Sequence, residues 1–412
     1  MMNTNRQVIS LHEISKLATK QEQWEPYAWF KDMRDQAPVH YNAEHDVWNV
    51  FSYDHVKRVL FDHELFSNKK ERSLIPIPDR LDNRSNVNLV DPPEHRKRRA
   101  LLAQAFTPRS LKDWEPRIQE IVDELIADME GDPVVDIVQK LAIPLPVTVI
   151  ADLLGVPSRD RHLIKAWSDI LFLPYNTEAY ADIDQQKGRA MKEFAEYLYP
   201  IVLEKRMHPA DDIISDLTKA ELEGERLTDE EVVMSAMGLL GAGNETTTTL
   251  ISNMFYCMLF DQPGIYQELR ADASLVPKLV EEVLRFRFGA TIDRKVARDT
   301  DVFGPEMKAG QLVVAWIGSA NRDESQFAQA DKFDIHRPGN QQHLTFGAGP
   351  HFCLGAPLAR LEANMALASF VKRFADIRQT EEFNIVDHLT VSITGQSLKS
   401  LPIGLIHGEN RE

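Results

Sequence analysis

Cysteine is nearly absent from this sequence of 412 residues, which contains only Cys257 and Cys353. The two lie far apart, and the residues around Cys257 are apolar, so a disulfide framework is not expected. Positive charge is also in deficit, because 47 Lys and Arg residues stand against 63 Asp and Glu residues and leave a formal net charge of −16. This balance argues against nucleic acid as a partner, since such binding depends on neutralising phosphates.

Long apolar runs are missing as well. Residues 1–26 lack the continuous apolar stretch of a signal peptide or membrane anchor, and no later segment could span a bilayer. We therefore expect a soluble, cytoplasmic monomer with no membrane partner. No repeat, low-complexity tract or linker divides the chain, so residues 1–412 are expected to form a single domain, with poor order over residues 1–23.

The apolar pattern predicts a mainly α fold with a smaller β portion (α+β). Residues 38–53 alternate as a β-hairpin does, whereas residues 109–130 and 160–172 follow the period of a helix. A longer helix begins near Thr228, where Glu231 completes a capping box, and continues to about Leu259. Its middle, residues 241–249, is rich in Gly and Thr, which are poor helix formers. Such a conflict inside a strong helix indicates a functional segment.

The loop at residues 346–355 carries the strongest signal. Its glycines allow a close backbone approach, and Cys353 directly precedes a helical pattern, whose N-terminus favours a thiolate. The alternative is an inert, buried cysteine. A zinc site is not expected, because no second Cys or closely spaced His completes a tetrahedral set. A single thiolate on a metal suits haem.

This loop resembles the haem-binding loop of the cytochrome P450 superfamily, in its soluble bacterial branch. Phe346, Gly349, Cys353 and Gly355 match the fixed positions of that loop, and His351 stands where the family often carries a basic residue facing a haem propionate. The resemblance implies a cytochrome P450-like triangular fold around a buried haem b (iron protoporphyrin IX). It also implies the Cys353 thiolate as axial ligand and O2 as co-substrate.

Residues 242–247 resemble the oxygen-activation motif of the same family. The resemblance implies that Ala242 and Gly243 leave room for O2 beside the cofactor, and that Glu245 and Thr246 are catalytic and relay protons. The alternative is a glycine-kinked helix in which threonine hydroxyls bond back to the helix carbonyls.

Two further motifs concern charge. Glu282 and Arg285 share a helix face and resemble the Glu-x-x-Arg motif, which implies a structural lock with Arg337; the alternative is an ordinary surface ion pair. The resemblance also implies propionate contacts, which would come from His95, Arg99 and Arg294. The alternative is a solvated basic face, and we expect Arg96, Lys97 and Arg98 to point outward, where they could receive an acidic electron-transfer partner.

The resemblance implies a monooxygenase that inserts one oxygen atom from O2 into a hydrophobic substrate, such as a fatty acid, terpenoid or steroid-like molecule. No flavin or iron–sulfur domain is fused, so electrons are expected from a ferredoxin or flavodoxin with its reductase. Apolar residues in the family's variable regions are the expected substrate contacts, namely Leu74, Ile75, Leu239, Ala242, Phe288, Ile292 and Ile393. Two alternatives are a peroxygenase, disfavoured because Glu245 and Thr246 are present, and a haem sensor or carrier without turnover.

Overall fold

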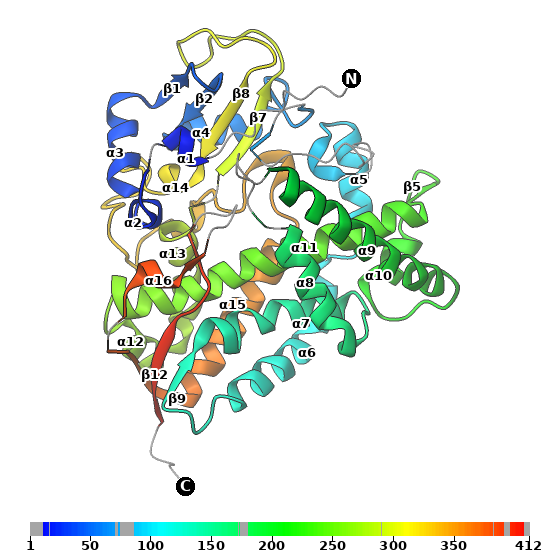
Figure 1. The fold of residues 1–412 in the computed structure, drawn as a ribbon, viewed down its shortest axis with the longest axis vertical. Helices are drawn as coiled ribbons and strands as arrows, with labels where there is room; N and C mark the ends of the chain where they lie inside the picture. Colours follow the sequence, from blue (N-terminus) through cyan, green and yellow to red (C-terminus); the bar gives the residue numbers. More distant parts are fainter. Residues whose placement is uncertain are drawn as a thin grey trace.

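The structure is a computed structural model that describes residues 11–15, 17–70, 73–74, 86–171, 173, 180–289, 291–381, 383–390 and 396–407. The strands of the largest sheet gather at one corner of the molecule, and helices make up most of the rest (Figure 1). The prediction of a mainly α fold with a smaller β portion is confirmed. None of the helices in the described part of the chain is long and apolar enough to cross a membrane.

The largest sheet has five strands in the order β1-β2-β8-β7-β3. These strands are β1 (Val39–Asn42), β2 (Val47–Val50), β8 (Leu312–Trp316), β7 (Thr291–Val296) and β3 (Phe66–Ser67). The first two form the antiparallel hairpin that the alternating pattern predicts, and β8 pairs with β2 in parallel. Every residue of β2 and β8 is buried, as expected for the middle of a sheet.

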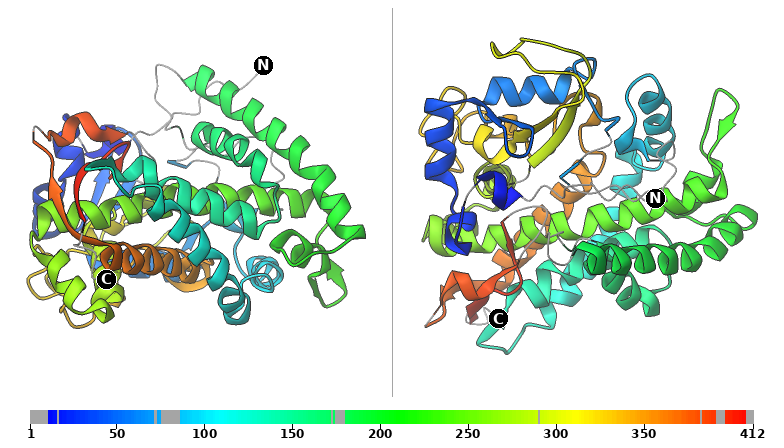
Figure 2. Two further views of the ribbon diagram at one scale, coloured as in Figure 1. Left: turned by 90° about the horizontal axis from the view of Figure 1, so that it is seen from below. Right: turned by 45° about the horizontal axis from the view of Figure 1, so that its top comes forward.

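The longest helical segment crosses the middle of the molecule (Figure 2). It is α11 (Asp229–Tyr256), capped by reciprocal hydrogen bonds between Thr228 and Glu231 as predicted, and it continues as one π-helical turn (Cys257–Asp261). The Gly- and Thr-rich middle remains α-helical. The helix packs against α7 (Pro144–Leu153), α9 (Tyr180–Met207) and α15 (Ala356–Arg373), and this packing compensates for the poor helix propensity.

Shorter elements complete the fold. The remaining helices are α1 (Leu11–Ser15), α2 (Lys20–Trp24), α3 (Tyr27–Gln36), α4 (Tyr53–Phe61), α5 (Glu94–Ala103), α6 (Pro108–Ala127), α8 (Arg161–Leu171), α10 (Ile213–Lys219), α12 (Ile265–Ala271), α13 (Val276–Phe286), α14 (Ile317–Ala320) and α16 (Ile385–His388). The smaller sheets consist of β4 (Val134–Asp136), β12 (Pro402–His407) and β9 (Phe374–Gln379), of β5 (Glu221–Leu222) and β6 (Glu225–Arg226), and of β10 (Leu389–Thr390) and β11 (Ser397–Leu398).

Several predicted boundaries can be compared with these elements. Helices α6 and α8 occupy the segments 109–130 and 160–172, which confirms both helices. Within residues 1–23, where we expected poor order, the structure has α1 and most of α2, and the buried side chain of Trp24 ends α2. The ring of Trp24 packs edge-on against Tyr256, which anchors the end of α2 on α11.

Two hydrophobic cores meet at the cysteine loop. The larger core is formed by the helices, and Phe346 and Leu354 pack against it. The second core lies against the large sheet and contains the buried side chains of Leu344 and Ala348. The loop that carries Cys353 is therefore held between the helical part and the sheet part of the molecule, both of which constrain its position.

Candidate functional site

The backbone of the cysteine loop adopts a conformation that requires glycine. Gly347 and Gly349 have φ angles of +73° and +69°, in the left-handed region where a side chain is strained. A Cβ atom on Gly349 would also lie 3.0 Å from the Cα atom of Phe61 on α4. The loop closes where the backbone N–H of Cys353 donates to the carbonyl oxygen of Phe346 at 2.8 Å.

The surroundings of the Cys353 thiol act on its pKa in opposite directions. Its residue is exposed, yet burial by surrounding atoms raises its pKa. The backbone N–H groups of Gly355 and Ala356, at the start of α15, oppose this rise by hydrogen bonding, and the charges of Arg99 and Arg360 oppose it further. Within the described residues, no group of three His, Cys, Asp or Glu side chains could hold a metal ion. Any metal at Cys353 must therefore bring most of its own ligands.

Helix α11 has an unusual exposed position near its centre. Ala242 is exposed, although α11 packs against several other helices, so this small side chain faces open space rather than a neighbour. Gly243 lies toward Ile150, where an added Cβ would make ordinary contact at 3.7 Å. The hydroxyl of Thr246 donates to the carbonyl oxygen of Ala242 at 2.6 Å, which is the back-bonding that the alternative interpretation predicts. Glu245 is half-buried beside it.

Four potentially cationic side chains come together near the cysteine loop, and we call His95, Arg99, Arg294 and His351 the cationic cluster. The rings of His95 and His351 lie 3.9 Å apart between centroids. Burial, and then the neighbouring positive charges, lower the pKa of His95 to about 4 and that of His351 to about 3. Burial also lowers the pKa of Arg294 to about 10.

No acidic side chain among the described residues forms an ion pair with the cationic cluster, although the charges of Asp91 and Asp293 act on Arg294. Within the ranges that the structure describes, Arg294 donates to the backbone carbonyl of Asp293, at 2.9 Å, and no partner is found there for the buried Nε2 atom of His351. Asp91 acts on the cluster electrostatically, but its oxygens already accept hydrogen bonds from Ser67 and Asn68. At neutral pH Arg99 and Arg294 carry the positive charge of the cluster, and together with the neutral imidazoles they fit an anionic ligand.

The predicted lock of Glu282, Arg285 and Arg337 forms in the core and not on the surface. Glu282 and Arg285 on α13 are 0% exposed and make two hydrogen bonds, of 2.7 and 2.9 Å. Arg337 donates to the same carboxylate at 3.3 Å. Arg285 also donates to the carbonyl oxygens of Asn321, Ala330 and Lys332, which ties α13 to the segment before the cysteine loop.

A second buried ion pair involves Asp293 on β7, next to Arg294. Its carboxylate accepts hydrogen bonds from Lys70 Nζ at 2.5 Å, from Ser73 Oγ at 2.7 Å and from the N–H of Leu74 at 2.9 Å. Burial raises the pKa of Asp293, but the charge of Lys70 and the hydrogen bonds to the carboxylate lower it by more, so the pKa lies below its ordinary value. Sequence reasoning missed this ion pair, because its partners are 223 residues apart and neither belongs to a motif.

The expected substrate contacts fall into different surroundings. Phe288 is buried in the helical core, and Leu239 packs against that core. Leu74 packs against a smaller core beside the sheet. Ile292 lies close to the cysteine loop, 3.9 Å from the position of a Cβ on Gly347. Ile75 and Ile393 lie outside the described residues. None of these positions identifies a substrate, so the contacts stay predictions.

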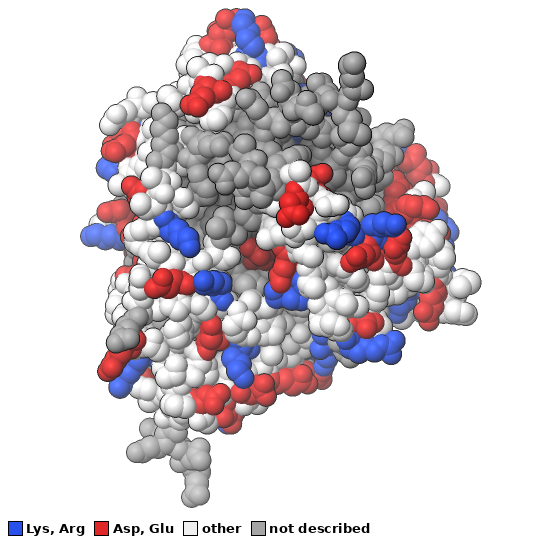
Figure 3. Space-filling view, in the orientation of Figure 1, with Lys and Arg blue, Asp and Glu red and all other residues white. Residues whose placement is uncertain are grey.

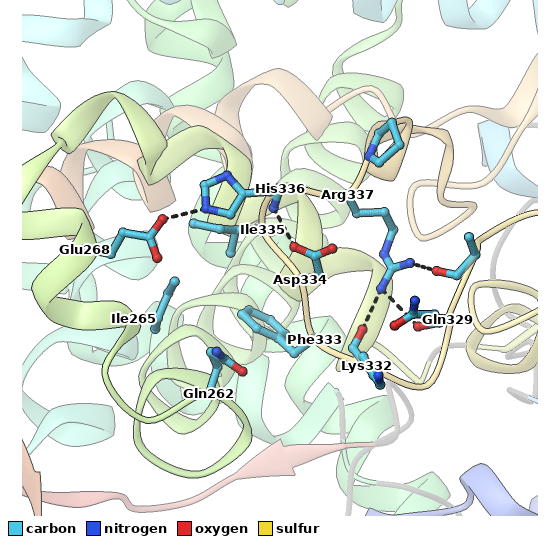
Figure 4. A pocket seen from close by; sticks show the side chains of 12 residues that line it. Gln262, Ile265, Glu268, Gln329, Lys332, Phe333, Asp334, Ile335, His336 and Arg337 are labelled. Carbon is cyan, nitrogen blue, oxygen red and sulfur yellow. Dashed lines mark hydrogen bonds and ion pairs between the residues drawn. The ribbon is translucent and has the colours of Figure 1, made fainter.

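One pocket, of about 420 Å³, is lined by residues 328–329 and 332–338 together with Gln262, Ile265 and Glu268. Figure 4 shows Glu268 joined to His336 across its wall, and Arg337 turned toward the carbonyl oxygens of Gln329 and Lys332. Its lining mixes polar and apolar side chains and includes neither Cys353 nor any residue of α11. We therefore assign it no part in the chemistry.

The basic residues of α5 differ from the expectation in part. His95 is buried and Arg96 is exposed, as expected. The expectation that Arg98 points outward is wrong, because its side chain is 19% exposed and binds Glu231 on α11 at 2.9 Å. Lys97 is exposed but pairs with Glu223 and Glu225. Figure 3 shows that described positive and negative side chains are interspersed on one face of the molecule.

Comparison with known proteins assigns the family. A family model described as Cytochrome P450 matches residues 8–399. This chain belongs to the cytochrome P450 family. It is 52% identical over 404 residues to Cytochrome P450(MEG) of Priestia megaterium, and this alignment covers 97% of this chain and 98% of that protein.

Solved P450 structures share the fold. CYP109E1 from Bacillus megaterium in complex with corticosterone has a TM-score of 0.84 and 42% identity, covering 93% of this chain and 99% of that chain. CYP109B1 from Bacillus subtilis has a TM-score of 0.83 and 43% identity, covering 93% and 100%. The chain is thus an oxidoreductase of the P450 monooxygenase type, a family that holds haem iron through a cysteine thiolate.

The residues present fit a haem. A lone thiolate at the start of a helix suits an iron that brings its own four nitrogen ligands. The cationic cluster suits the negative charge of the propionates, and the unpaired Nε2 atom of His351 suits a hydrogen bond to one of them.

Removing one member of the buried lock should destabilise the protein far more than breaking a surface ion pair. We expect Glu282→Gln to lower the free energy of unfolding by about 3–5 kcal/mol, because Arg285 and Arg337 would keep buried charge without a counter-charge. Lys31→Gln breaks exposed pairs with Asp35 and Glu324 and should leave the unfolding midpoint nearly unchanged. Urea denaturation of both variants measures the difference; equal stabilities would contradict a central role for the lock.

Proposed function

We propose that this chain is a haem-thiolate monooxygenase in which Cys353 binds the iron of haem b and the cationic cluster binds the propionates. When bound, the haem supplies the iron at which O2 is activated with two electrons. The reaction consumes substrate–H, O2, two electrons and two protons, and yields substrate–OH and water. The observation that carries this proposal is the cluster itself: Arg294 is buried with no ion pair among the described residues, and the buried Nε2 atom of His351 has no hydrogen-bond partner there.

The surroundings of Cys353 favour its ionised form once the iron is present. The N–H groups of Gly355 and Ala356 donate toward the sulfur, and they stabilise a thiolate more than a thiol. The loop fixes the sulfur from the other side, since the N–H of Cys353 is bonded to Phe346. Rigid placement of the ligand on a loop held between two cores limits competing ligation geometries.

Thr246 and Glu245 are proposed to move protons at the centre of α11. The Thr246 hydroxyl donates to the carbonyl oxygen of Ala242, and rotation of the O–H about the Cβ–Oγ1 bond would direct its proton into the open space that Ala242 borders. Glu245 lies one residue earlier and is half-buried, so its carboxyl group could resupply that proton from solvent. The exposed Ala242 leaves room for O2 and substrate next to this hydroxyl.

The substrate is proposed to be hydrophobic, from the class of fatty acids, terpenoids and steroid-like molecules. The apolar character of Leu239, Phe288 and Ile292 supports this class, and the structures of CYP109E1 with corticosterone and with testosterone make steroids the first probes. Asp293 is occupied by Lys70 and Ser73, so we do not propose it as a substrate contact. Electrons are proposed to come from a ferredoxin or flavodoxin with a reductase, and the chain is proposed to act as a monomer.

The proposed reaction is tested by following oxygen atoms. The purified holoenzyme is mixed with corticosterone, a terpenoid and a long-chain fatty acid in turn, with a ferredoxin, its reductase and NADPH under isotopically labelled O2. We expect at least one hydroxylated product that carries a single labelled oxygen atom. Turnover that needs hydrogen peroxide and ignores the reductase would instead indicate a peroxygenase, and haem binding without any product would support a sensor or carrier.

Loss of the Thr246 hydroxyl should uncouple electron use from product formation. In Thr246→Ala we expect the ratio of product to NADPH consumed to fall severalfold while hydrogen peroxide rises, because the proton source beside the O2 site is removed. Thr246→Ser keeps the hydroxyl and serves as the matched control, with coupling close to that of the unmodified enzyme. If Thr246→Ala remained fully coupled, the proposed relay would be wrong.

A further inference from the structure

A charge pair lies next to the cysteine loop and belongs to none of the motifs discussed so far. We propose that Arg360 and Glu281 tune the electron-donating strength of the Cys353 thiolate, and with it the reduction potential of the haem. Both are positioning residues in the sense that they act through the ligand and do not touch the reacting atoms. The inference rests on the proposed role of Cys353.

Arg360 is held in a fixed place on α15. Its Nε atom donates to Glu281 Oε1 at 2.5 Å and its Nη2 atom to Glu281 Oε2 at 3.0 Å, which is a bidentate pair. The guanidinium carbon lies 4.6 Å from the centre of the Phe346 ring. Because the carbonyl oxygen of Phe346 accepts the N–H of Cys353, the positive charge rests on the residue that holds the ligand in place.

His343 fixes the other side of the carboxylate. Its Nδ1 atom accepts the N–H of Thr345 at 3.2 Å, so the ring proton is on Nε2, which lies 3.2 Å from Glu281 Oε2 and donates to it. Burial lowers the pKa of His343, although Glu281 opposes this effect. A ring with one proton is neutral, and His343 therefore orients Glu281 without adding charge.

The network thus contains one negative and one positive charge. Although burial raises the pKa of Glu281, the hydrogen bonds from His343 and Arg360 lower it to about 2, so the carboxylate is ionised at neutral pH. Its neighbour Glu282 makes its contacts with the buried lock, away from this pair. Removing Arg360 leaves a net negative charge beside the loop, and removing Glu281 leaves a net positive charge.

These two changes should move the haem potential in opposite directions. Reduction adds an electron to the iron, so a nearby positive charge favours the reduced state and a negative charge opposes it. Of the other charges that act on Cys353, Arg99 is part of the cationic cluster and is unchanged by either substitution. A role limited to packing would instead shift both variants in the same direction, or neither.

The test is a spectroelectrochemical titration of the purified, substrate-free holoenzyme. We expect Arg360→Gln to lower the midpoint potential, Glu281→Gln to raise it, and the double variant to return close to the unmodified value because its net charge is restored. Arg360→Lys keeps the charge and should shift the potential less than Arg360→Gln. Lys372→Gln removes an exposed cation from the last turn of the same helix and is the control, with no expected shift.

The outcomes separate this inference from the proposed function. Single variants that shift the potential in the same direction, or a double variant at least as far from the unmodified enzyme as either single one, would overturn the inference. If Arg360→Gln does not fold, Glu281→Gln alone decides, since a lowered or unchanged potential would contradict the account. An unmodified protein that shows no thiolate-ligated haem would instead overturn the role of Cys353 itself.

Discussion

The burial of positive charge in the cationic cluster is the constraint on which the rest of the structure depends. Moving cations out of water is costly unless an anion accompanies them, and no acidic side chain in the described part of the chain forms an ion pair with the cluster, although the charges of Asp91 and Asp293 act on Arg294. The cluster is assembled from α5, from β7 and from the turn before Cys353. An anionic cofactor would therefore stabilise three distant segments at once, and binding and stability are expected to be linked.

The protein holds these segments with two internal ion-pair systems. The lock of Glu282, Arg285 and Arg337 ties α13 to the chain leading into the cysteine loop, and the pair of Lys70 and Asp293 holds β7 in register beside Arg294. Each is buried, so each contributes specificity of position more than net stability. Both systems hold segments that carry the ligand loop or the cationic cluster.

Much of this arrangement follows from local sequence patterns, and some of it does not. The hairpin, the capping box at Thr228 and the contact between Glu282 and Arg285 depend on neighbours within a few residues, so sequence alone predicts them. Residue identities and spacing also predict the loop around Cys353. By contrast, the sequence predicts a solvated Arg98, because no neighbouring residue indicates that Glu231 on α11 forms an ion pair with it. Pairs such as Lys70 with Asp293 are equally hidden, since their partners are joined only by the tertiary fold.

The most direct test of the account is the optical spectrum of the purified protein, reduced with dithionite under carbon monoxide, next to that of Cys353→Ala. The account predicts the long-wavelength Soret band of a thiolate-ligated haem in the unmodified protein and its loss in the variant. A colourless protein, a spectrum typical of histidine ligation, or a variant that keeps the band unchanged would contradict the assignment of Cys353.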